Sequence, residues 1–407
     1  MITYRVGIVL YSILIVTSII GSSVSVPFGG LNISLFKCLF PVLFAIIILK
    51  SRKNLISNQV LFTICFLLFW FLYAMVSLAW IVNIQLWVVY TTYIIIFVWS
   101  VFLALIALKT NDDIYRIVKV YIKMWQFCTI VGLWEICTGI YLFIGDYSSI
   151  QMTMQNPLCF TKNVNDFSTF LTVGSILSMV VDYKKSLYIN GNIFFIILTF
   201  FEVYYGESRA NMLGLILAVF VFCLFKFGKK NIRYFLKFLY FIGVASILVF
   251  LYQTFALDYL VNYFEFGSSN YIRINLINNG IKMLNESCMI GVGAGNSNVI
   301  EYMVFDTCGI VNLHNFWLQI FVEYGVLIGI AFFINYGIMM IQMMSIFRLS
   351  TNFLPMRMAA VFLCVQIILL ISLVSTSNAF QFEWLFLLWG VMNAFISINY
   401  RLCCITK

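Results

Sequence analysis

Apolar stretches of about twenty residues recur along the whole chain and are separated by short polar connections. A helix needs about 20 predominantly apolar residues to cross the hydrocarbon core of a bilayer. The sequence therefore predicts an all-α, polytopic integral membrane protein of about twelve membrane-spanning helices. The expected spans are 4–22, 31–49, 60–82, 86–108, 120–142, 166–182, 188–205, 211–227, 234–256, 315–346, 358–374 and 379–399.

The composition gives no room for an appended soluble domain. Of the 407 residues, 63% are hydrophobic and 10% are charged, whereas soluble proteins are roughly half apolar and about a quarter charged. We therefore expect one membrane-embedded domain, residues 1–407. The net charge of +9 does not indicate nucleic acid as a partner, because the placement of basic residues is more informative in such a chain.

Metal-ligand spacing is absent from the sequence. The chain has a single histidine, and most of its eleven cysteines lie within apolar runs, where they pack as small hydrophobic residues. We expect no metal site and no cofactor. Cys288 and Cys308 lie in one external connection, where either a disulfide or two free thiols would be compatible with the sequence.

Basic residues mark alternate connections between the predicted spans. They cluster at 50–53, 109–123, 184–185, 226–233, 348–357 and 401–407. Because Lys and Arg concentrate in cytoplasmic loops, both termini are expected in the cytoplasm. The first apolar segment also resembles a cleavable signal, but the alternation favours an uncleaved helix. The 112–123 stretch has helically spaced cations and is interpreted as an interfacial segment that leads into the fifth span.

Two external connections are long, 145–165 and 257–313. Long connections in compact domains are usually functional or disordered. The second contains enough aromatic and aliphatic residues to pack onto the membrane surface, so we expect an ordered external loop. Its GVGAGNSN segment, 291–298, lacks the Lys-Ser/Thr and the βαβ setting of a nucleotide site. Glycines that allow a tight turn are the better explanation.

Few cations are expected on the outer side: Lys162, Arg209, Arg273 and Lys282. An ionised side chain near the membrane is costly unless it is paired. Arg209 could form a salt bridge with Glu207 or Glu202, or it could bind an anion, for which a planar guanidinium is well suited. His314 has a side chain whose ordinary pKa suits proton transfer near neutral pH, although an interfacial histidine without chemistry is the alternative.

Four segments in this order resemble the O-antigen ligase/polymerase superfamily, which includes Wzy-type polysaccharide polymerases and O-antigen ligases. They are NPLCFTKNVNDFSTFL at 156–171, ESRANMLGL at 207–215, the Arg-led helix and glycine turn from Arg273 to Asn296, and His314-Asn315 with the later Gly325. The resemblance covers roughly residues 150–335.

The resemblance implies a GT-C-like, metal-independent glycosyltransferase in the bacterial cytoplasmic (inner) membrane. Its substrate would be an undecaprenyl-diphosphate-linked oligosaccharide at the outer face, with a chain-length regulator and a flippase as further partners. A diphosphate leaving group needs cations directed at the developing negative charge, which Arg209 and Arg273 would supply. His314 or Glu207 would act as the base. Substrate binding is assigned to both arginines and to Asn165, Asn315 and Gly293.

The leading hypothesis is a polymerase of lipid-linked repeat units for a surface polysaccharide such as O-antigen or capsule. A ligase that attaches glycan to a lipid or protein acceptor is the alternative within the superfamily. A transporter or flippase of lipid-linked glycans is the alternative from another class. Transporters favour internal repeats and charges at the membrane midplane, and the sequence shows no convincing repeat.

Overall fold

The computed structural model describes residues 2–21, 25–28, 31–50, 57–141, 155–161, 163–180, 191–226, 269–376 and 379–405. These residues are almost entirely helical. The helices are α1 (Ile2–Ile20), α2 (Leu35–Lys50), α3 (Leu61–Val76), α4 (Ile84–Ala107), α5 (Asn111–Thr138), α7 (Val164–Ser178), α8 (Gly191–Tyr205), α9 (Arg209–Lys226), α11 (Ser269–Glu286), α12 (Phe316–Leu349), α13 (Phe353–Ser372) and α14 (Glu383–Ile405). Two short strands, β1 (Ser25–Phe28) and β2 (Leu31–Ser34), pair antiparallel, and short 3-10 turns occur at Asn58–Val60, Ser77–Ala79, Asn296–Asn298, Ile300–Tyr302 and Ala379–Gln381.

Each predicted span that the structure describes contains a helix, although the bounds differ. The span at 234–256 lies outside the described residues. Among the residues that the structure describes, five helical segments are long and apolar enough to cross a membrane: 58–79, 84–107, 111–138, 316–349 and 353–372. The all-α, multi-pass architecture is thus confirmed, while the count of twelve spans and the GT-C-like arrangement remain predictions.

Two local features differ from the sequence-based expectation. The predicted span at 31–49 begins instead with strand β2, and its helix starts at Leu35. The predicted interfacial stretch at 112–123 is continuous with the fifth span in the single helix α5. Thr110 and Asp113 form a capping box at its start, which satisfies the first free N–H groups and lets the helix begin in this charged segment.

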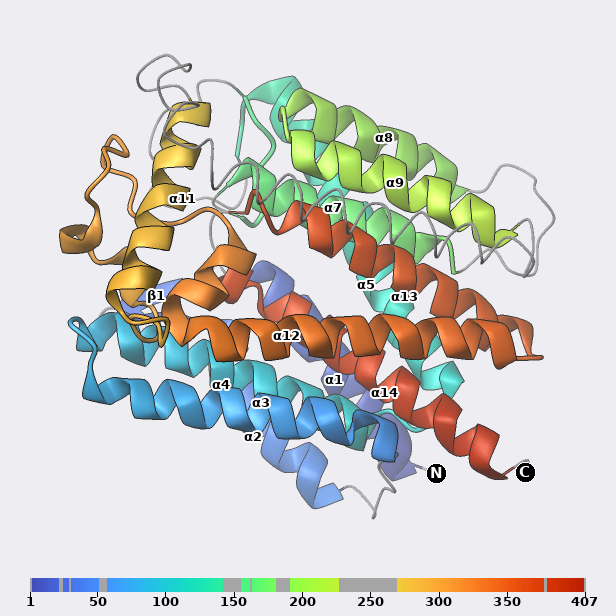
Figure 1. The fold of residues 1–407 in the computed structure, drawn as a ribbon. Helices are drawn as coiled ribbons and strands as arrows, with labels where there is room; N and C mark the ends of the chain where they lie inside the picture. The colour runs from blue at the N-terminus through green and yellow to red at the C-terminus, as the bar shows by residue number, and fades with distance from the viewer. Residues whose placement is uncertain are drawn as a thin grey trace.

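The long helices run alongside one another, and α12 extends across the whole bundle (Figure 1). Helix α11 stands at a steep angle to them at one end of the bundle, and both chain termini lie at the opposite end (Figure 1). The connection between α3 and α4 and the loop between α11 and α12 share the α11 end. The polar connections that carry the candidate residues are thus gathered at one end.

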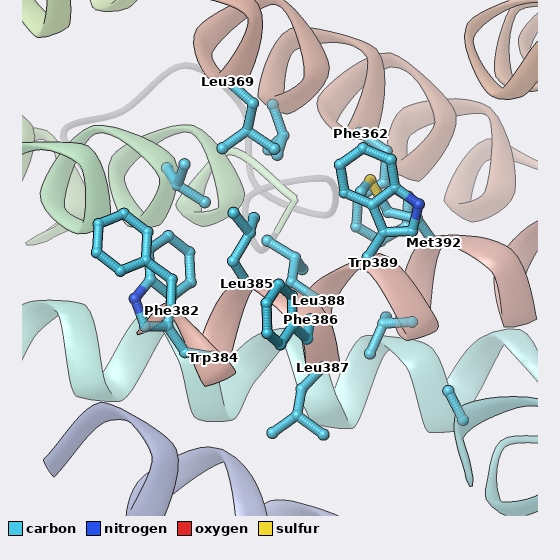
Figure 2. Close-up of a cluster of buried hydrophobic side chains, with 14 of the residues drawn as sticks. Phe362, Leu369, Phe382, Trp384, Leu385, Phe386, Leu387, Leu388, Trp389 and Met392 are labelled. Atoms are coloured by element: carbon cyan, nitrogen blue, oxygen red, sulfur yellow. The ribbon is translucent and has the colours of Figure 1, made fainter. Parts of the chain in front are cut away.

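Helix α14 forms the centre of the bundle. Its segment from Phe382 to Trp389 is buried on nearly every side, as expected for a helix that is apolar all round. Figure 2 shows Phe362 and Leu369 of α13 in the same cluster as the side chains of α14. Gly390 permits close packing on α4, since an added Cβ would lie 2.6 Å from the carbonyl oxygen of Ser100. Small residues allow such close helix approach in membranes.

A buried ion pair links three helices near the α11 end. Lys37 Nζ of α2 lies 3.8 Å from Glu383 Oε1 of α14, and it donates a hydrogen bond of 3.1 Å to the Tyr93 hydroxyl of α4. The two charged side chains are only 14% and 6% exposed. Lys37 is thus packed against a counterion within the bundle.

Candidate functional site

The turn between α8 and α9 consists of residues 206–208 and packs directly on the start of α7. A Cβ on Gly206 would lie 2.5 Å from Val164, so only glycine fits this close approach. Glu207 has a φ of +51°, a left-handed conformation that is uncommon for residues other than glycine. The connection is therefore short and tightly packed, and the backbone leaves the turn in a defined direction.

A hydrogen-bond clamp holds this turn to α7. The Ser208 hydroxyl donates to Asn165 Oδ1 at 2.7 Å. Asn211 Nδ2 donates to the Asn165 backbone oxygen at 3.1 Å and to Ser208 Oγ at 2.9 Å. Thr169 completes the clamp by donating to Asn211 Oδ1 at 3.2 Å. The predicted substrate-binding residue Asn165 therefore has its side-chain oxygen engaged within the protein.

Arg209 is the first residue of α9, and its side chain is exposed. The two ion pairs formed among the described residues are Lys37–Glu383 and Lys282–Glu286. The salt bridge between Arg209 and Glu207 or Glu202, which the sequence left open, is thus not observed in this part of the chain. Arg209 follows the clamped turn directly, so the clamp determines where its side chain begins.

Arg273 lies on α11, which confirms the helix predicted at the base of the long loop. Asn275 Nδ2 donates to the Asp306 backbone oxygen at 2.7 Å. Asn279 Oδ1 accepts the N–H groups of Val304 and Phe305, both at 2.9 Å. These amides tie α11 to the segment that leads to His314.

His314 lies immediately before α12 in a strained conformation, with a φ of +48°. Its backbone N–H donates to Asn312 Oδ1 at 3.2 Å. The next residue, Asn315, caps α12 by accepting the Leu318 N–H at 3.1 Å. Residues held in left-handed conformations cluster at functional sites, where the surrounding structure stabilises the strain. His314 is thus placed by the loop and by the cap together.

The three predicted site residues, two arginines and one histidine, are linked electrostatically. The pKa of Arg273 is lowered by partial removal from water and by the positive charge of Arg209. The pKa of His314 is lowered from 6.5 to about 4 by burial and by the positive charge of Arg273. Arg209, Arg273 and His314 come from three separate segments, and the fold brings Arg273 within electrostatic range of both Arg209 and His314. The two neighbouring guanidinium charges favour binding of an anion.

The glycine segment of the long loop docks onto a break in α12. Gly325 interrupts the helix with φ +77° and ψ 173°. The N–H groups of Val292 and Gly293 donate to the backbone oxygens of Val322 and Glu323 at 2.8 and 2.9 Å. A Cβ on Gly325 would lie 2.6 Å from two loop carbonyl oxygens. The glycines thus permit a tight turn and close backbone contact, as the sequence predicted.

Gly293 is buried in this contact. An added Cβ would lie 2.5 Å from Ile81 of the α3–α4 connection, and its N–H is already bonded to Glu323. The structure therefore places Gly293 in a packed interface, whereas Arg209 and Glu207 are exposed beside the α8–α9 turn. Roles in substrate binding for Gly293, Asn165 and Asn315 remain predictions.

Glu323 is the site-supporting residue to which the sequence assigned no role. Its carboxylate is fully buried and accepts hydrogen bonds from the Gly295 N–H at 2.9 Å, Ser297 Oγ at 2.6 Å and Gln319 Nε2 at 2.7 Å. A carboxylate satisfied by three donors can remain buried. The sequence signal for this buried role was the position of Glu323 in an apolar helix, four residues after Gln319 and therefore on the same helix face.

The apolar helices make this chain a multi-pass, all-helical membrane protein. Residues 194–334 match the model of the O-antigen ligase family, and this range contains Arg209, Arg273 and His314. The chain is also similar to the teichuronic acid biosynthesis protein TuaE of Bacillus subtilis (strain 168). The two are 23% identical over 347 residues, which cover 81% of this chain and 70% of TuaE. Both matches support the O-antigen ligase/polymerase superfamily, and the predicted resemblance is confirmed.

Proposed function

We propose that this protein is a membrane glycosyltransferase of surface polysaccharide assembly that polymerises lipid-linked repeat units. The observation that carries the proposal is the electrostatic coupling of Arg209, Arg273 and His314 at one end of the bundle. Two comparisons support the class of function: the O-antigen ligase match over the same residues and the similarity to a teichuronic acid biosynthesis protein.

The chemistry of a lipid-diphosphate donor fits this cluster. The acceptor hydroxyl oxygen attacks the anomeric carbon of the donor sugar, and the bond from that carbon to the diphosphate oxygen breaks. The undecaprenyl diphosphate that leaves gains negative charge as the bond breaks. Arg209 and Arg273 would bind its phosphate oxygens through paired N–H groups and stabilise that charge. Binding would also relieve the repulsion between the two guanidinium groups.

The proton of the acceptor hydroxyl needs a base. A pKa of about 4 leaves His314 neutral at neutral pH, so its imidazole can accept a proton. An anion bound at the two arginines would offset the positive charge that disfavours protonated His314. The proton could then pass to the leaving diphosphate. Glu207 is the rival base, because it lies exposed on the turn next to Arg209.

The orientation of the protein follows from the basic residues. We place both termini in the cytoplasm and the Arg209–Arg273–His314 end on the outer face of the bacterial inner membrane. Figure 1 supports the relative placement, because the termini and α11 lie at opposite ends. The undecaprenyl-linked oligosaccharide would approach from the bilayer, with the flippase and chain-length regulator as functional partners.

A strain that lacks the gene distinguishes polymerase from ligase. Loss of a polymerase should leave single-repeat glycan on the surface, whereas loss of a ligase should leave long chains on the lipid carrier. Glycan length is measured by gel electrophoresis of surface and lipid-linked fractions. Vectorial uptake of lipid-linked glycan by proteoliposomes, without any glycan elongation, would favour the transporter alternative instead.

A further inference from the structure

Two buried glutamates lie beneath the α8–α9 turn and are not used by the proposed mechanism. Glu135 is in the last turn of α5, where its backbone oxygen accepts the Gly139 N–H at 2.9 Å. Glu202 is in the last turn of α8, where its backbone oxygen accepts the Gly206 N–H at 2.9 Å. Both side chains are fully buried. The two helices contact each other.

Gly132 brings the two acids to the same interface. A Cβ at this position would lie 2.7 Å from Glu202 Oε2 and 2.9 Å from the Phe167 ring. The Glu202 carboxyl therefore rests against the backbone of α5, where only glycine leaves it room. Because Gly132 precedes Glu135 by three residues, both lie on the same face of α5. The Glu202 side chain is thus directed at the face that carries Glu135.

The hydrogen bonds of this pair are incomplete. Glu135 Oε2 accepts the N–H groups of Leu158 and Cys159 at 2.7 and 2.9 Å. Glu135 Oε1 and both carboxyl oxygens of Glu202 are buried without a hydrogen-bond partner among the residues that the structure describes. Three orphaned oxygens at one interface require an explanation, because buried polar atoms are nearly always satisfied.

The described groups around the pair supply no positive charge. Cys128 on α5 and Cys159 in the segment before α7 face it, and burial raises the pKa of the Cys159 thiol well above its usual range, so that thiol is neutral. Tyr141 lies near Glu135 and Tyr205, and its hydroxyl donates to the Asn156 backbone oxygen at 3.0 Å. Two ionised carboxylates in such surroundings would repel each other and lose their hydration.

We propose that Glu135 and Glu202 form a proton-binding site in which Glu202, buried against Gly132 on the face of α5 that carries Glu135, is a neutral carboxylic acid. One proton taken from solvent removes one of the two negative charges from this buried interface. The arrangement resembles paired carboxyl groups that cannot both ionise because like charges lie close together. Proton binding here does not depend on glycan transfer.

The proton would link pH to the position of the catalytic turn. Helix α8 ends three residues after Glu202, and the turn with Glu207 and Arg209 follows at once. Loss of the proton would create two like charges between α5 and α8 and force their ends apart. The folded protein then binds a proton that the unfolded chain releases above about pH 4.3, the ordinary pKa of glutamate. Stability should therefore fall as pH rises.

Infrared difference spectroscopy tests the protonation directly on the full-length protein in lipid nanodiscs. At pH 7, subtraction of the Glu202→Gln spectrum from that of the wild type should reveal the carbonyl stretch of a protonated carboxyl group, shifted in D2O. The matched control is Glu286→Gln, because Glu286 has 60% of its side chain exposed and pairs with Lys282. A carboxylate band in place of the carbonyl stretch overturns the proposal. If Glu202→Gln fails to fold, Glu135→Gln decides: the carbonyl band of Glu202 should remain in that variant at a shifted frequency, and its replacement by a carboxylate band contradicts the proposal.

Thermal unfolding between pH 6 and 9 gives the second readout. We expect Glu202→Gln to lose less stability over this range than the wild type, while Lys162→Ala follows the wild type. A wild-type pH profile in Glu202→Gln contradicts the proposal. If Lys162→Ala alone abolishes the pH dependence, an ion pair accounts for the orphaned oxygens and the proposal is contradicted. If sodium but not choline stabilises the wild type, a bound metal cation accounts for them, which also contradicts the proposal.

Discussion

Two groups of cations lie toward the same end of the bundle and differ in what neutralises them. Lys37 lies 3.8 Å from Glu383 and donates to Tyr93, so its charge is compensated within the protein. The positive charge of Arg209 instead lowers the pKa of Arg273, and the positive charge of Arg273 lowers the pKa of His314. The first group holds helices together, whereas the second lacks an acid that would balance it in the described part of the chain.

This contrast separates structural from functional charge. Evolution of a membrane protein disfavours ionised groups near the bilayer unless they are paired or take part in function. A pair such as Lys37–Glu383 is complete without a ligand. A set of mutually repelling cations is stabilised when an anion binds, so the same repulsion that destabilises the empty site contributes to affinity for a diphosphate. The following experiments compare these two groups.

Removal of either arginine should have the largest effect on activity. Arg273→Ala and Arg209→Ala should each lower glycan polymerisation roughly 100-fold to 1000-fold, the loss typical for a group that stabilises transition-state charge. Membrane abundance and thermal stability should stay close to wild type, because neither side chain forms an ion pair with a described residue. Surface-glycan length and protein level are measured in the same cells. Full-length polymer from either variant would refute the assignment of that arginine.

Substitution of the paired lysine should show the opposite pattern. Lys37→Met leaves Glu383 buried without its counterion, and breaking such a pair typically costs about 3–5 kcal/mol of stability. The thermal unfolding midpoint should fall clearly, and Glu383→Gln in the same chain should restore much of it. Residual polymerisation per folded molecule should remain. A stable but inactive Lys37→Met protein would show that Lys37 belongs with the functional cations.

Disruption of the hydrogen-bond clamp that precedes Arg209 should have an intermediate effect on activity. Ser208→Ala removes the 2.7 Å bond to Asn165, and a hydrogen bond of this kind contributes about 1 kcal/mol. We expect donor KM or kcat to change by roughly fivefold, with recovery in Ser208→Thr. An Asn165→Ala/Ser208→Ala double variant should lose less than the sum of the single losses, because both remove one interaction. Additive losses would place Asn165 on the substrate instead.

The single histidine allows the coupling to Arg273 to be measured directly. NMR of histidine-labelled protein should give one titration with a pKa near 4 in the wild type. Arg273→Gln removes a positive charge and should shift the pKa of His314 toward 6.5. Because the folded pKa of His314 lies below the unfolded value, its contribution destabilises the fold as pH falls from 6.5 toward 4. An unchanged pKa in Arg273→Gln would show that the two groups are not coupled.

Chelation should have the smallest effect. The mechanism places arginines where other glycosyltransferases use a divalent cation, so EDTA should leave polymerisation by purified protein unchanged. Added Mg²⁺ should also have no effect. Lys162→Ala serves as a mild variant in the same assay, because the sequence assigns that lysine no catalytic part. Activity that requires Mg²⁺ would contradict the prediction of metal independence.

The sequence by itself determined the helices, since they depend on local patterns. Apolar runs of sufficient length specify spans wherever they occur, and the order of short motifs indicated the superfamily. The Ser-Arg turn and the helix of Arg273 were also local, because a glycine, a short polar break or a run of helix-compatible residues is enough to specify each.

Tertiary structure alone decided which side chains meet. No local pattern showed that Asn165 would clamp Ser208, that Glu323 would hold the glycine segment or that Glu202 would face Glu135, because these contacts join residues 26 to 67 positions apart. The same limit explains why the pairing of Arg209 stayed open. Which side chains contact each other in a membrane bundle depends on how the helices pack. Hydrophobicity does not specify this packing, because lipid is as apolar as the helix faces themselves.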